Sequence, residues 1–139
     1  MSSKRFFTCK YPDEIQELMV IHPYTLLVLA GLIAYCHDRG YPAPVITCLA
    51  RTPDEDDAVH AESDSHSTLR AFDVSGKSYT QAQIDDICSY MNKEFEQYAA
   101  VTKSGAKRLA LYHKTDIGAL HFHFQIHGRF RLPTFKGMK

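Results

Sequence analysis

The sequence LHFHFQIH, residues 120–127, alternates between apolar and polar side chains without interruption. Successive side chains of a strand point to opposite faces of a sheet, so this alternation predicts a strand with one apolar and one polar face. The apolar face would carry Leu120, Phe122, Phe124 and Ile126, and the polar face His121, His123, Gln125 and His127. Imidazoles crowded on one strand face are costly unless they are solvated, paired or bound to a ligand. The strand alone leaves open a solvated face, a metal site and an acid–base site.

Upstream, the stretch DSHSTLRAFDV, residues 64–74, brings another histidine and a carboxylate into an apolar setting. His66 would end a loop, and Asp73 would lie in an alternating strand that runs from residue 69 to 75. The residues on either side of Asp73 are apolar and would face the core, so Asp73 would face the other side, where an unpartnered carboxylate is costly. A hydrogen bond to the backbone would satisfy it. Beside the histidine strand, a His/Asp/His zinc site with an open water position becomes the better account.

The other segments predict the rest of the fold. They indicate helices at residues 11–21, 24–38 and 80–98, strands at residues 45–49 and 109–113, a long polar loop at residues 51–68 and a hairpin connection at residues 114–119. Gly40 would end the second helix, and the Thr80–Gln83 capping box would open the third. This order predicts an α+β fold in which helices flank a small, mostly antiparallel sheet.

Length, charge and hydropathy limit the classes of function that this chain can have. A chain of 139 residues suits one domain spanning residues 1–139. Its 16 basic and 16 acidic residues give no net charge, so a broad nucleic-acid-binding surface is not expected. Residues 18–36 approach the length of a membrane span. Because His22, Pro23 and Thr25 interrupt the apolar run, it favours a buried helix over membrane insertion.

The cysteines and the N-terminal residues indicate a compartment. The four cysteines are Cys9, Cys36, Cys48 and Cys88. No two of them have CxxC spacing, and the chain is too large to depend on a disulfide scaffold, so free thiols in a reducing compartment are expected. The N-terminal stretch MSSKRFFTCKYPDEI lacks the apolar core of a secretory signal. We therefore expect synthesis in the cytoplasm without a signal peptide.

Three motifs carry a resemblance to a known family. The stretch HSTLRAFDV resembles the His-x6-Asp signature of the Hedgehog-like zinc peptidases, which include bacterial D-alanyl-D-alanine carboxypeptidases and phage L-alanyl-D-glutamate endolysins. In the family pattern S-x-H-x-x-G-x-A-x-D, His66, Ala71 and Asp73 match, whereas Asp64 and Leu69 replace the usual Ser and Gly. VITCLART, residues 45–52, resembles the family's preceding strand with its Arg-Thr, and HFH, residues 121–123, resembles its terminal H-x-H. The resemblance spans roughly residues 24 to 127 in the family's order.

The resemblance implies a Hedgehog/DD-peptidase-like fold and a set of site residues. By analogy, His66, Asp73 and His123 would hold Zn²⁺, and Arg51 would bind a substrate carbonyl or carboxylate and stabilise the oxyanion. Many members place their acidic general base three residues before the last ligand, and here that position is Leu120 on the predicted core face. Two substitutes are Asp116 in the preceding turn and His121 on the ligand's face, and we expect them to act together. Further candidates for substrate contact or ligand support are His113, Gln125, His127, Ser65 and Arg70.

The activity implied by this resemblance is hydrolysis of the peptidoglycan stem peptide by a zinc metallopeptidase. A monomeric phage endolysin would be made in the cytoplasm and would act at the bacterial cell wall after release or within a virion. Two alternatives stay open: a non-catalytic Hedgehog-like zinc-binding module of a virion, and a metal-free α+β domain whose histidine face binds an anionic ligand. The sequence fixes neither the wall bond nor the choice between endo- and carboxypeptidase, and a His/Asp/His set also accepts other divalent metals.

Overall fold

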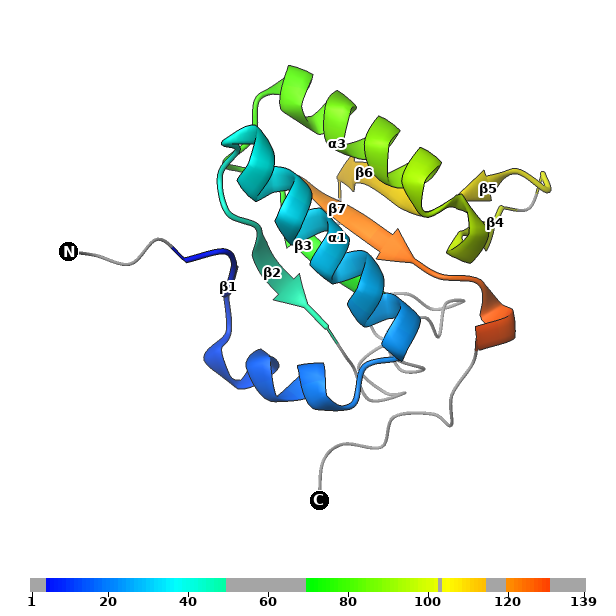
Figure 1. The fold of residues 1–139 in the computed structure, drawn as a ribbon, viewed down its shortest axis with the longest axis horizontal. Helices are drawn as coiled ribbons and strands as arrows, with labels where there is room; N and C mark the ends of the chain where they lie inside the picture. Colours follow the sequence, from blue (N-terminus) through cyan, green and yellow to red (C-terminus); the bar gives the residue numbers. More distant parts are fainter. Residues whose placement is uncertain (1–4, 50–69, 103, 115–119, 131–139) are drawn as a thin grey trace.

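The structure, a computed structural model, describes residues 5–49, 70–102, 104–114 and 120–130. These residues form an α+β fold with a sheet of five strands in the order β1-β2-β3-β7-β6, and two helices lie across one face of that sheet (Figure 1). The sheet strands are β1 (Thr8–Cys9), β2 (Val45–Cys48), β3 (Ala71–Ser75), β6 (Ala110–Lys114) and β7 (Leu120–Gln125). A separate hairpin pairs β4 (Ala100–Val101) with β5 (Lys107–Arg108). The α-helices are α1 (Pro23–Arg39) and α3 (Gln81–Glu94), and the short 3₁₀ helices are η1 (Pro12–Met19), η2 (Glu96–Tyr98) and η3 (Gly128–Phe130).

The predicted α+β class and flanking helices are confirmed, but the sheet is mixed. Strands β2, β3, β7 and β6 pair antiparallel, whereas β1 runs parallel to β2 at one edge. Strand β1 was not predicted, because a two-residue strand is too short to show an alternation. The β4–β5 hairpin escaped prediction for the same reason.

The helix boundaries follow from local chemistry. Gly40 ends α1 in the left-handed conformation, with a φ of 71°, as its position after the basic last turn predicted. The capping box at the start of α3 is present: the Thr80 hydroxyl accepts from the Gln83 N–H at 3.2 Å, and the Gln83 side chain accepts from the Thr80 N–H at 3.0 Å. α3 ends at Glu94, before the predicted residue 98, and a 3₁₀ turn continues the chain. No helix within the described segments is long and apolar enough to cross a membrane.

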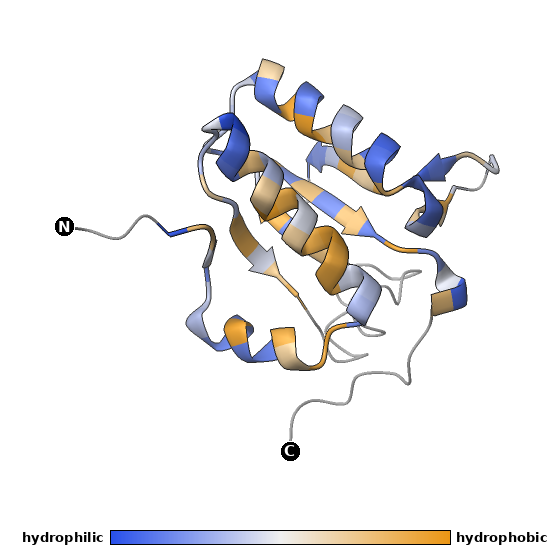
Figure 2. Cartoon of the chain, viewed as in Figure 1, coloured by the Kyte–Doolittle hydropathy of each residue, from blue (hydrophilic) through white to orange (hydrophobic). Residues whose placement is uncertain are grey.

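The helix-facing side of the sheet forms the core. Phe72, Phe122 and Phe124 are buried there, and the rings of Phe72 and Phe124 stack with centroids 4.7 Å apart. Figure 2 shows the alternation along β7 as bands of opposite hydropathy. Leu120, however, is 45% exposed, so the prediction that it belongs to the core is wrong, although it lies on the same face of β7 as Phe122. It pairs with Lys114 at the end of the β6–β7 hairpin, one row beyond Tyr112 and Phe122, and so lies past the edge of the core.

Gly31 marks the close approach of α1 to the end of α3. A Cβ atom at Gly31 would overlap Cζ of the Phe95 ring, well inside contact distance. Alanine in place of glycine ordinarily stabilises a helix interior by up to about 1 kcal/mol. We expect Gly31→Ala to lower the free energy of unfolding instead, by about 1–3 kcal/mol in urea titrations, because the methyl group displaces the Phe95 ring. In a Phe95→Leu background the same change should cost less; an equal loss in both backgrounds would contradict the close approach.

An aromatic–carboxylate cluster joins the C-terminal part of α1 and the residues after it to the first half of α3. The hydroxyls of Tyr35 and Tyr41 donate to the Asp86 carboxylate at 2.9 and 2.6 Å. The Tyr41 hydrogen bond lowers the pKa of Asp86, with smaller lowering contributions from Tyr35 and Arg39. A lowered folded-state pKa means that the stabilisation is present above the unfolded carboxyl value of about 4 and is lost as pH falls through the folded value.

Removing the Tyr41 hydroxyl should therefore have a pH-dependent effect. We expect Tyr41→Phe to raise the pKa of Asp86 towards its ordinary value, as measured by carboxyl ¹³C NMR. The difference in thermal unfolding midpoint between wild type and Tyr41→Phe should shrink as the pH is taken from 6 to 2. Tyr24→Phe, at an exposed tyrosine of α1, provides the control and should show no such trend. A Tyr41→Phe difference that is constant with pH would disprove the coupling.

Candidate functional site

The sheet face opposite the helices gathers polar side chains from three strands. Directly opposed residues of antiparallel strands share a face. One row across the sheet joins Ser75 of β3, His121 of β7 and His113 of β6. The next row joins Asp73, His123 and Leu111. The prediction that Asp73 faces away from the core is thus confirmed. The strand pairing places its carboxylate beside His123.

Asp73 and His123 are in direct contact at the centre of this face. Nδ1 of His123 lies 2.8 Å from Oδ1 of Asp73, and Asp73 is only 3% exposed. On its other edge the imidazole has its Nε2 atom 3.0 Å from Oε1 of Gln125. The His123 side chain keeps 15% of its surface exposed, so the ring bridges a buried carboxylate and the outside of the sheet.

The contacts of His123 are compatible with a metal ligand held by a supporting amide. The Asp73 carboxylate and the Oε1 atom of Gln125 both only accept hydrogen bonds, so the Asp73 contact calls for a proton on Nδ1 of His123 and the Gln125 contact for one on Nε2. If Nδ1 bound a cation in place of its proton, the Nε2–H would still donate to Gln125, the kind of contact that orients ligating histidines. Nδ1 of His123 and Oδ1 of Asp73 lie 2.8 Å apart, and an imidazole nitrogen and a carboxylate oxygen are donor types that would hold zinc.

Two further histidines border this pair. The rings of His113 and His121 meet nearly edge-on, with centroids 4.4 Å apart and an interplanar angle of 76°. His113 also lies 6.4 Å from the ring of His123, and His121 is 7% exposed. Burial lowers the pKa of His113, and the charges of His123 and Arg108 lower it further, against a raising contribution from Asp73. A neutral imidazole is therefore favoured beside the Asp73–His123 pair.

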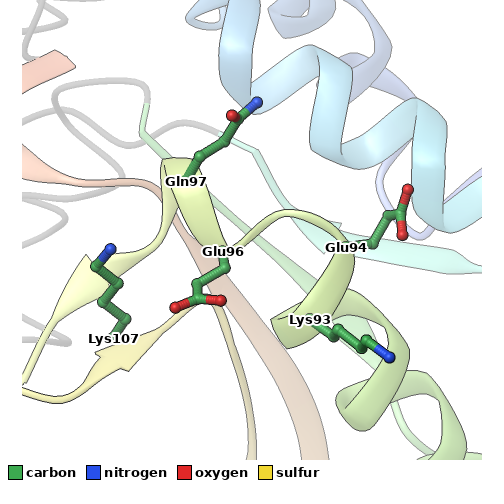
Figure 3. Close-up of a pocket in the computed structure, with 5 residues that line it drawn as sticks. All are labelled: Lys93, Glu94, Glu96, Gln97 and Lys107. Carbon is green, nitrogen blue, oxygen red and sulfur yellow. The ribbon is translucent and has the colours of Figure 1, made fainter.

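A small cavity of about 110 Å³ opens next to His123, between the β4–β5 hairpin and the β6–β7 pair. Its polar lining comprises Thr102, Arg108, His123 and Gln125, and its apolar lining includes Val101, Leu109 and Leu111. A larger hollow of about 400 Å³ lies between the end of α3 and β5, lined by Lys93, Glu94, Glu96, Gln97 and Lys107 (Figure 3). That hollow has no histidine in its lining, so the smaller cavity is the one that adjoins the candidate chemistry.

The remaining candidates are placed elsewhere or lie outside the described residues. Arg70 is buried, and its Nη1 donates to the carbonyl of Ile126 at 3.2 Å, a contact that fixes the end of β7. His127 lies beyond the strand, where its Nδ1 accepts the N–H of Arg129 at 2.9 Å. Neither contact tests a role in substrate binding. The predicted residues outside the described part of the chain are Arg51, Ser65, His66 and Asp116.

The structure thus assembles part of the proposed ligand set and adds residues that the sequence analysis passed over. Within the described ranges, no three His, Cys, Asp or Glu side chains gather as a metal-binding group, and the proposed third ligand His66 belongs to residues 50–69, which are not described. Thr102 and Arg108 had not been singled out. The only available signal was the TKSG turn, residues 102–105, between two short segments, which is compatible with a hairpin.

Comparison of the chain with protein-family models, with curated proteins and with solved structures found no match. The resemblance to Hedgehog-like zinc peptidases therefore depends on the three sequence motifs.

The proton position on His123 is a direct test of the Asp73 contact. In metal-free protein we expect His123 to carry a proton on Nδ1, because the Asp73 carboxylate can only accept. Long-range ¹H–¹⁵N NMR correlations distinguish the two ring nitrogens. Asp73→Ala should shift the tautomer towards Nε2–H, whereas Asp85→Ala, at an exposed carboxylate of α3, should not. A wild-type His123 without a proton on Nδ1 would refute the assigned contact.

Proposed function

We propose that this protein is a zinc metallopeptidase that hydrolyses the peptidoglycan stem peptide, with a Hedgehog/DD-peptidase-like fold. The observation that carries the proposal is the Asp73–His123 contact of 2.8 Å on the polar face of the sheet. These two residues come from separate motifs, 50 positions apart in the chain, and each occupies a ligand position in the family pattern. The α+β architecture, with helices on the opposite face of the sheet, is compatible with that fold.

The residues divide the expected chemistry among them. His66, Asp73 and His123 would hold Zn²⁺, which supplies an activated water and polarises a carbonyl when bound. Gln125 would fix the orientation of His123 through the ring nitrogen that faces it at 3.0 Å. Asp116 and His121 would exchange protons with water and with the leaving amine, and Arg51 would bind a substrate oxygen.

The setting of His121 favours a role in proton transfer. It is in ring contact with His113 and lies on the same face as His123, two residues away. Burial lowers the pKa of the neighbouring His113, so a neutral imidazole rather than a second positive charge borders His121. A base with an unprotonated neighbour experiences less repulsion when it takes up a proton.

A phage endolysin is the biological setting that these assignments fit best. Such an enzyme would be made in the cytoplasm without a signal peptide and would reach the cell wall after release or as part of a virion. It would act as a monomer on a peptide substrate. Zero net charge argues against nucleic acid as the partner.

One observation favours a second candidate, a Hedgehog-like module that binds zinc without catalysis. Leu120 takes the position that is acidic in many family members, and its side chain is 45% exposed at the rim of the sheet. A hydrocarbon side chain there can neither accept nor donate a proton. If neither Asp116 nor His121 replaces the acid, the site would bind metal without efficient hydrolysis.

Zinc content and wall digestion, measured on the same sample, test the proposal. We expect one zinc per chain and mass-spectrometric release of stem-peptide fragments, both lost in His66→Ala and His123→Ala. Asp116→Ala and His121→Ala should retain zinc and lower kcat/KM by about 10²–10⁴-fold if each contributes to proton transfer. His37→Ala, at an exposed histidine of α1, is the matched control. Zinc binding without cleavage would support the non-catalytic zinc-binding module. Failure to bind zinc after reconstitution would refute both the peptidase and the zinc-binding module.

A further inference from the structure

The cavity beside His123 has a cation in its wall that the proposed hydrolysis does not use. Arg108 lines this cavity together with Thr102, Gln125 and His123. Leu109, the residue after Arg108, and Leu111, which pairs with His123, line it as well. Arg108 therefore stands at the edge of the candidate site rather than on a remote surface.

The strand geometry separates Arg108 from its basic neighbour. Successive residues of β5 point to opposite sides, so Lys107 and Arg108 diverge. Lys107 lines the larger hollow, whose lining also includes Glu94 and Glu96 (Figure 3). Arg108 lines the smaller cavity, whose described lining contains no Asp or Glu. A cation in a cavity without carboxylates is suited to an anionic ligand.

The size and the walls of the cavity limit that ligand. Its volume of about 110 Å³ is smaller than the roughly 150 Å³ cavity that accommodates benzene in a protein core. Val101, Leu109 and Leu111 supply apolar wall, while Thr102 and Gln125 supply hydrogen-bonding groups. A guanidinium holds a carboxylate with two parallel hydrogen bonds. The best fit is a small aliphatic group that carries a carboxylate.

The hairpin that presents Arg108 is fixed against the strand that carries His123. Ala100 pairs with Arg108, the N–H of Gln125 donates to the Leu109 carbonyl at 3.0 Å, and the N–H of Thr102 donates to the Ala106 carbonyl at 2.8 Å. Ala99, just before β4, forms an isolated bridge with Ile126, just after β7. Because His123 itself lines the cavity, a ligand bound there would lie beside a candidate metal-ligating side chain.

We propose that the Arg108 cavity binds the carboxylate of the substrate residue that directly follows the scissile bond. This inference rests on the proposed peptidase function. Two substrate classes share that chemistry: an alanyl-glutamate, whose glutamate carries a free carboxylate, and an alanyl-alanine, whose second residue ends in a carboxylate. Arg108 is a specificity-determining residue in this scheme, and it acts beside Arg51 rather than in its place.

Paired ligands with and without the carboxylate test the subsite on the full chain. The probes are N-acetyl-L-alanyl-D-glutamine, in which the γ-carboxyl is blocked as an amide, against its α-amide, and N-acetyl-D-alanyl-D-alanine against its C-terminal amide, with Kd measured by NMR titration. We expect at least one carboxylate form to bind about tenfold or more tightly than its amide, as a charge-assisted hydrogen bond predicts. The pair that shows the preference identifies the substrate class.

Two variants of adjacent basic residues make the test specific. Arg108→Gln should abolish the preference for the carboxylate, whereas Lys107→Gln, the same change of charge one residue away, should keep it. Equal binding of both forms by the wild type, or a preference that survives in Arg108→Gln, would overturn the subsite. The result is separable from the peptidase proposal: a preference without hydrolysis supports the subsite and counts against catalysis, and hydrolysis without a preference does the reverse.

Discussion

A carboxylate that is almost fully removed from water, at Asp73 in the middle of β3, constrains the rest of this sheet. Burial of an unpaired charge costs several kcal/mol, so the strand must place Asp73 opposite a partner. His123 of β7 is one such partner, directly across the ladder at 2.8 Å. A slip of one residue between the strands would turn Phe122 and Phe124 out of the core and would break the contact between Asp73 and His123. The same register of β3 and β7 therefore sets both the packing of the core and the geometry of the candidate site.

One face of the sheet forms the hydrophobic core, and the opposite face carries the candidate site. The helix-facing side buries stacked phenylalanines under α1 and α3 and supplies the apolar burial that holds the domain together. Asn92 connects that layer to the edge of the sheet: its Oδ1 accepts the N–H groups of Leu109 and Ala110, and its Nδ2 donates to the Ala110 carbonyl. This amide fixes the start of β6, and with it the β5 segment next to the cavity. A helix side chain thus helps to position groups on the opposite side of the sheet.

The arrangement also separates the proposed chemistry from the proposed recognition. Reacting groups would come from the central strands β3 and β7, where the ladder hydrogen bonds and the core packing hold them in place. Arg108 comes from a short hairpin at the periphery, where a change of residue would alter the ligand preference with little effect on the core. Leu120, at the rim of the sheet, contributes to neither function: it lies outside the core, and its hydrocarbon side chain cannot transfer a proton.

The sequence by itself determined the α+β class, the position of α1, the capping box of α3 and the division of β7 into two faces, because periodicity and capping are local properties of the chain. It also singled out Asp73 and His123, but only as members of separate motifs. Tertiary structure alone decided that they touch, that His113 and His121 meet beside them, and that Arg108 shares a cavity with His123. It also moved Leu120 out of the core and added the parallel edge strand β1. These contacts join residues far apart in the chain through strand register, and register is set by the packing of the whole sheet rather than by any one segment.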